Sequence, residues 1–109
     1  MTGKLSRLHD VLPSLAVELT DLLTSAGHSS LAEQVPSLRI FDRCRCDDWF
    51  CATFYTAPPP KGAWGSKHEN VALDPEQGYL VLDVLDGKIV AVEALYRDDL
   101  RKPLWEHVP

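Results

Sequence analysis

The dipeptide Asp86-Gly87 lies between two apolar runs, Tyr79 to Leu85 and Lys88 to Leu95, and it constrains this chain more than any other feature. Asp-Gly between apolar runs is the strongest short-range hairpin signal, because both residues tolerate the positive φ angles of a two-residue turn. Such a turn predicts three cross-strand pairs on one face: Val84 with Ile89, Leu82 with Ala91, and Leu80 with Glu93. The chain is therefore expected to contain an antiparallel sheet.

Both faces of this hairpin are largely apolar. The second face would carry Val81, Asp83, Val90 and Val92. A sheet with one face in water alternates apolar and polar residues, so we expect both faces to be covered. The expected cover is the N-terminal helix on one face, and the long loop, the C-terminal tail or a second subunit on the other.

An apolar stripe at helical spacing marks the N-terminal part of the chain. Its members recur every three or four residues, at Leu5, Leu8, Leu12, Leu15, Leu19, Leu22 and Ala26. The spacing predicts one face of a helix, which packs in the core or binds a partner helix. Pro13 either kinks this helix or opens it at its first turn, and Gly27 is the expected C-cap. Ser30-x-x-Glu33 is typical of a capping box and predicts a short second helix that ends at Pro36.

The middle of the chain changes to strand-forming residues. Leu38 to Cys46 and Trp49 to Thr56 flank Asp47-Asp48, a pair that favours a turn. The prolines at positions 58 to 60 begin a loop that is expected to extend to Asn70, because proline cannot donate a ladder hydrogen bond. Val71 to Leu73 then predicts a short strand.

Length and pattern together predict one α+β domain over residues 1–109. One or two N-terminal helices in residues 1–36 are expected to pack on a four- to five-stranded antiparallel sheet, built from hairpins, in residues 37–96. Residues 97–109 form a tail, in which a helical turn from Asp98 to Leu104 is expected to break at Pro103.

All three cysteines of the chain, Cys44, Cys46 and Cys51, lie within eight residues of one another. A two-residue turn at 47–48 would place Cys44 opposite Cys51 and all three thiols on one face of the sheet. Four interpretations stay open. The thiols pack as small apolar groups, bind zinc with His68 as the fourth ligand, form a reversible disulfide between Cys44 and Cys51, or include a nucleophile paired with His68.

The net charge of −5 limits the choice of partners, because an acidic surface repels nucleic acid and attracts a basic protein. No apolar run approaches the roughly 18 residues of a membrane-spanning helix, and no signal peptide follows Lys4 and Arg7. We therefore expect a cytoplasmic protein with no membrane contact.

Glu93 stands in an apolar strand, where it is either a buried acid with a raised pKa or a partner of Arg97.

Two separated motifs carry a resemblance to a known family. They are Cys44-x-Cys46-x-x-x-x-Cys51-Ala52-Thr53-Phe54-Tyr55 and Leu80-Val81-Leu82-Asp83-Val84-x-Asp86-Gly87. Over most of residues 30 to 96 the chain resembles a family of small bacterial proteins of uncharacterised function. The resemblance implies that the cysteines and the acidic hairpin belong together, and it implies no activity, cofactor or catalytic residue.

The chain carries no P-loop, dinucleotide-binding, EF-hand or zinc-protease signature. We therefore expect a non-enzymatic protein-interaction module without a cofactor, which binds a protein partner or forms a homodimer. An immunity or inhibitor role fits the size and the charge. The alternative is a metal-binding, zinc-containing or redox-responsive protein that uses Cys44, Cys46, Cys51 and His68.

Overall fold

The computed structural model describes residues 5–109, and it confirms an α+β fold with an antiparallel sheet built from hairpins. The elements follow one another as α1 (Leu8–Val11), α2 (Pro13–Ser25), α3 (Ser29–Gln34), the 3₁₀ helix η1 (Val35–Ser37), β1 (Asp42–Arg43), β2 (Phe54–Tyr55), β3 (His68–Ala72), β4 (Tyr79–Leu85), β5 (Lys88–Leu95) and α4 (Asp98–His107). Residues 1–4 of the expected helical part lie outside the described residues.

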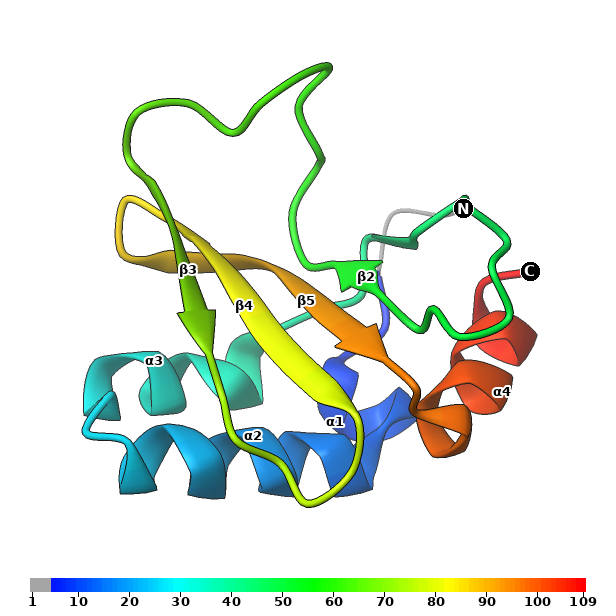
Figure 1. The fold of residues 1–109 in the computed structure, drawn as a ribbon, viewed down its shortest axis with the longest axis horizontal. Helices are drawn as coiled ribbons and strands as arrows, with labels where there is room; N and C mark the ends of the chain where they lie inside the picture. Colours follow the sequence, from blue (N-terminus) through cyan, green and yellow to red (C-terminus); the bar gives the residue numbers. More distant parts are fainter. Residues whose placement is uncertain (1–4) are drawn as a thin grey trace.

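The sheet has five strands in the order β1-β2-β5-β4-β3, and every neighbouring pair is antiparallel. Figure 1 shows α2 and α3 running along one side of the sheet, with α4 beside the connection between β1 and β2. The β2–β3 loop rises away from the helices. Across the described residues 5–109, no helix is long and apolar enough to span a bilayer.

The N-terminal stripe forms two helices, because Leu12 leaves the helical conformation and Pro13 opens α2 at its first position. The buried residues of the stripe also differ from the expected ones. Leu23 is fully buried, whereas Leu22 is half-buried and Ala26 is exposed. The 3.6-residue period of an α-helix explains the difference, since a strict alternation of three and four residues assumes a period of 3.5.

The second helix differs from its expected boundaries at both ends. Gly27 has a φ of +84° and turns the chain, as a helix-ending glycine does. However, α3 begins after His28 with no side-chain capping bond, so the expected capping box at Ser30 and Glu33 is wrong. Pro36 does not end the helical segment, which continues through it as η1 because a 3₁₀ turn accepts proline near its start.

The Asp86-Gly87 turn forms as expected, with φ angles of 53° and 80° and with Val84 opposite Ile89. The two other expected pairs are wrong, because a β-bulge follows at once. Ala91 lies opposite Asp83, so Val90 has no partner and the remainder of β5 shifts by one residue.

A one-residue shift exchanges the faces of a strand, and the bulge therefore decides which side chains meet the helices. One row of directly opposed residues faces the helical core: Val71, Leu82, Val92, Phe54 and Arg43. The row on the second face is mostly polar: Asn70, Asp83, Ala91, Tyr55 and Asp42. Glu93 and Cys44, each two residues along its chain from that row, share the second face.

Two expectations for the later chain are also corrected. The β3 strand begins at His68, inside the segment expected to be loop. The α4 helix runs through Pro103 rather than breaking there. Burial of Leu100 and Leu104, worth about 1.5–3 kcal/mol each, offsets the hydrogen bond that proline cannot donate.

Candidate functional site

The three cysteines lie together in the connection between β1 and β2. Their sulfur atoms are all within 4.8 Å of one another. Cys51 is buried, Cys44 is half-buried and Cys46 is exposed, and all three thiols are free. The grouping expected from sequence is therefore present, and one side of it opens to solvent.

The local backbone explains why three residues spaced unevenly in sequence converge. Asp47 adopts a left-handed φ of 61°, which reverses the chain after Cys46. The Cys51 N–H then donates to the Asp48 carbonyl oxygen at 3.1 Å. Cys51 also pairs with Leu95 in an isolated bridge, which holds it against the end of β5.

The register of this connection differs from the expected two-residue hairpin. Arg43 lies opposite Phe54, and the Cys44 N–H donates to the Thr53 carbonyl oxygen at 2.8 Å, so Cys44 is not opposite Cys51. The difference amounts to two residues. Because side chains alternate with a period of two, an even shift leaves the cysteines on the face that the sequence predicted.

The three thiols act as one electrostatic unit. Burial alone would disfavour a Cys51 thiolate, but hydrogen bonds from Thr53 and from the Cys46 and Cys44 thiols outweigh it and lower the Cys51 pKa. For Cys46, a backbone hydrogen bond from Asp48 favours the thiolate. Desolvation, hydrogen bonds with Cys44 and Cys51, and the charge of Cys44 together outweigh that effect and raise the Cys46 pKa to about 12. The group therefore favours the thiolate on Cys51 and disfavours it on Cys46.

Arg43 ties this connection to α4. Its guanidinium lies 3.7 Å from the Trp105 ring centre, and its Nε donates to the Val108 carbonyl oxygen at 2.7 Å. It also contacts Asp47 at 3.5 Å. Because Arg43 is buried, the contacts fix β1 and the following turn against the C-terminal helix.

His68, the fourth ligand considered from sequence, lies elsewhere. It begins β3, at the opposite edge of the sheet from β1. Its Nε2 is 2.7 Å from Oδ1 of Asp83, which also accepts from Asn70, and its ring stacks on Trp64. Among the described residues, the group with metal-ligand geometry consists of the three cysteines without a histidine.

A second group of titratable side chains surrounds Asp83, which the sequence analysis did not single out. A hydrogen bond to Asp83, then burial, then the negative charge of Asp83 raise the pKa of Glu93 to about 7, against an opposing effect of His68. Arg97 does not pair with Glu93, because its guanidinium binds Glu18 and Asp99. Glu93 is half-buried with a raised pKa, and its alternative pairing with Arg97 is wrong. The bulge at Val90, which places Glu93 beside Asp83, has no signal in the sequence.

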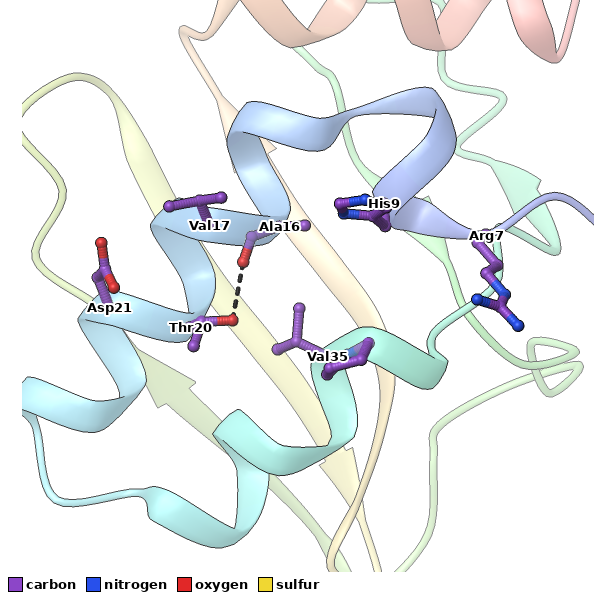
Figure 2. Close-up of a pocket in the computed structure, with 8 residues that line it drawn as sticks. Arg7, His9, Ala16, Val17, Thr20, Asp21 and Val35 are labelled. Atoms are coloured by element: carbon purple, nitrogen blue, oxygen red, sulfur yellow. Dashed lines mark hydrogen bonds between the residues drawn. The ribbon is translucent and has the colours of Figure 1, made fainter.

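A hollow on the helical side of the molecule offers less reactive chemistry than the cysteine group. It measures about 360 Å³ and lies between α1, α2 and η1 (Figure 2). Ala16, Val17 and Val35 line it, and the nearby Thr20 hydroxyl donates to the Ala16 carbonyl oxygen. Figure 2 shows Arg7 and Asp21 at opposite ends of the hollow. We assign no reaction to this arrangement.

Comparison with known protein families, with curated proteins and with solved structures finds no match to this chain. The resemblance noted from sequence therefore stays a prediction. The function is inferred below from the geometry of the cysteine group.

Proposed function

We propose that this protein binds a thiophilic metal ion, zinc in the first instance, through the thiolates of Cys44, Cys46 and Cys51. The observation that carries the proposal is the approach of all three sulfur atoms to within 4.8 Å of one another. A zinc ion that holds thiolates at about 2.3 Å in a tetrahedron keeps its sulfurs about 3.8 Å apart. Small side-chain rotations would therefore close the group around a metal.

The electrostatics of the group support the same function. The hydrogen bonds that lower the Cys51 pKa come partly from Cys46 and Cys44, so the neighbouring thiols favour the Cys51 thiolate. A divalent cation would replace the thiol protons and compensate the desolvation and the charge repulsion that contribute to the raised Cys46 pKa. Binding would therefore release protons and strengthen as the pH rises.

The fourth coordination position would be open. No histidine or carboxylate joins the three cysteines in this group within residues 5–109. Structural zinc sites are closed by four protein ligands, whereas three protein ligands leave one position for water or a bound molecule. Exposed Cys46 lies on the solvent side of the group, which gives such a molecule access.

The test is metal binding by the reduced protein. We expect about one zinc per chain by elemental analysis, and an intense sulfur-to-cobalt charge-transfer band when Co²⁺ is used as the probe. Cys46→Ser removes an exposed sulfur with little risk to the fold, and it should weaken Co²⁺ binding by at least about tenfold.

His68→Gln is the matched control, because His68 is bound to Asp83 at the other edge of the sheet. It should leave the cobalt spectrum and the affinity unchanged. Reduced protein that binds neither Zn²⁺ nor Co²⁺, or a Cys46→Ser variant that binds with unchanged affinity and spectrum, would contradict the proposal.

A further inference from the structure

Four aromatic side chains gather beside the cysteine group and remain open to solvent. The aromatic patch consists of Trp49, Phe50, Tyr79 and Tyr96. Trp49 is 67% exposed, Tyr79 is 61% exposed and Tyr96 is 51% exposed. Ring centres lie between 5.4 Å (Phe50 to Tyr96) and 6.0 Å (Trp49 to Tyr96 and Tyr79 to Tyr96), so the rings form one continuous surface. Scattered single apolar residues are ordinary on a protein surface, but a contiguous group of this kind marks an interaction site.

The patch is assembled from three separate segments. The Cys51–Leu95 bridge joins the β1–β2 connection to the end of β5, and the Tyr96 N–H donates to the Phe50 carbonyl oxygen at 2.8 Å. Tyr96 itself has a left-handed φ of 57°, a conformation that costs a side chain other than glycine roughly 1–2 kcal/mol. Glycine would be more stable in this conformation. The large exposed ring at position 96 therefore indicates a functional role for the ring.

Carboxylates flank two segments of the patch in the sequence. Asp47 and Asp48 precede Trp49, and Asp98 and Asp99 follow Tyr96 closely. Asp47 and Asp99 are paired with arginines, whereas Asp48 and Asp98 make no ion pair with any residue in the 5–109 range. Aromatic faces with unpaired carboxylates beside them attract a cation that can stack on a ring and pair with a carboxylate.

The chain already contains this contact within its own fold. Two guanidinium groups lie over the Trp105 ring, that of Arg43 at 3.7 Å and that of Arg101 at 4.1 Å from the ring centre. Trp49 offers a similar face, but solvent covers most of it.

We propose that the aromatic patch is a docking surface for a basic segment of another protein, whose arginine or lysine side chains stack on Trp49 and Tyr96 and pair with Asp48 and Asp98. This surface goes beyond the metal site, since none of its residues is a metal ligand. A second copy of this chain is a poor occupant. Each copy carries a charge of −5, and joining two patches would bring like-charged aspartates together.

The test is a titration with two short peptides that differ only in charge. One carries three arginines in a glycine-serine background, and the other carries citrulline, the neutral analogue of arginine, at the same positions. We expect the arginine peptide to quench tryptophan fluorescence and to bind at least about tenfold more tightly than the citrulline peptide.

Two variants separate ring stacking from general charge attraction. Trp49→Ala and Tyr96→Gly leave the net charge unchanged, and each should weaken binding of the arginine peptide by at least about tenfold, measured by calorimetry. Glycine suits the left-handed φ at position 96, so that variant should keep its thermal midpoint. Trp64→Ala is the matched control, because Trp64 stacks on His68 outside the patch, and it should bind like the parent.

Three results would overturn the proposal. They are equal affinity for the two peptides, unchanged affinity in both Trp49→Ala and Tyr96→Gly, and no peptide binding together with a dimer that Trp49→Ala abolishes. The last result would assign the patch to self-association. Repeating the titration on Cys46→Ser protein should give the same affinity, which keeps this outcome distinct from that of the metal experiment.

Discussion

At the scale of single residues, the neighbours of Glu93 in the sequence do not determine the protonation of its carboxyl group. The residues around it are apolar, which is compatible both with an ion pair to Arg97 and with a buried acid. Arg97 is already bound by Glu18 and Asp99, so no cation is left for Glu93 from that side. The carboxyl group meets Asp83 instead, and its pKa rises to about 7.

This raised pKa predicts a pH-dependent stability. Because the folded state binds the Glu93 proton more tightly than the unfolded chain does, with its ordinary pKa near 4.5, this contribution is fully present below about pH 4.5. It is lost as the pH rises through about 7. We expect a loss on the order of 1 kcal/mol, reduced from the full linkage value because Glu93 is partly exposed.

Urea denaturation at about pH 5 and about pH 8 measures this effect. Glu93→Gln should remove most of the difference between the two pH values. Glu69→Gln, which removes the same charge from an exposed position on β3, should preserve the difference. If both variants behave alike, the coupling between Glu93 and Asp83 is not its source.

At the scale of elements, α3 supports the β4–β5 hairpin through one glutamine. The Gln34 side-chain amide donates to the Gly87 carbonyl oxygen at 2.7 Å, and its carbonyl oxygen accepts from the Ile89 N–H at 2.9 Å. The turn at Asp86-Gly87 can be predicted from the sequence. The hydrogen bonds of Gln34 to this hairpin cannot, since the two segments are separated by more than fifty residues.

We expect Gln34→Ala to lower the free energy of unfolding by about 1–2 kcal/mol, because it leaves the Ile89 N–H without its partner beside the bulge. Chemical denaturation measures the change. Ser30→Ala is the control from the same helix, and it should cost less than about 0.5 kcal/mol because α3 has no side-chain capping bond. A loss from Ser30→Ala as large as that from Gln34→Ala would contradict this assignment.

At the scale of the whole molecule, Arg97 joins parts of the fold that are far apart in sequence. Its guanidinium binds Glu18 on α2 and Asp99 on α4, and contacts the Gln77 carbonyl oxygen in the β3–β4 turn. Gly78 in that turn has a φ of +66°, and a Cβ there would overlap the Leu95 carbonyl oxygen. The turn, α2 and α4 therefore depend on the same buried cation.

Arg97→Leu should destabilise the protein by about 2–3 kcal/mol, because Glu18 loses its partner while Asp99 is exposed enough to be rehydrated. The free energy of unfolding in urea tests this value. Asp99→Asn keeps the Arg97–Glu18 pair and should cost less than about 1 kcal/mol. Equal losses for the two variants would show that the contact with Asp99, rather than the link to α2, is what matters.

The α+β class, the Asp86-Gly87 hairpin and the convergence of the cysteines on one face could all be predicted from local patterns in the chain. Each of these depends on local periodicity or on turn chemistry, which a few neighbouring residues specify. The cysteines lie on one face as predicted, although the predicted register was wrong by two residues, because an even shift does not change which face a side chain occupies.

Contacts between distant segments set the remaining features. The bulge at Val90 turned Glu93 toward Asp83, the strand order placed His68 at the opposite edge of the sheet from the thiols, and core burial carried α4 through Pro103. The aromatic patch likewise depends on the pairing of both Cys51 and Tyr79 with Leu95. The physical reason is common to all four: each balances a local preference against contacts with residues distant in sequence, and such contacts leave no periodic pattern in the chain.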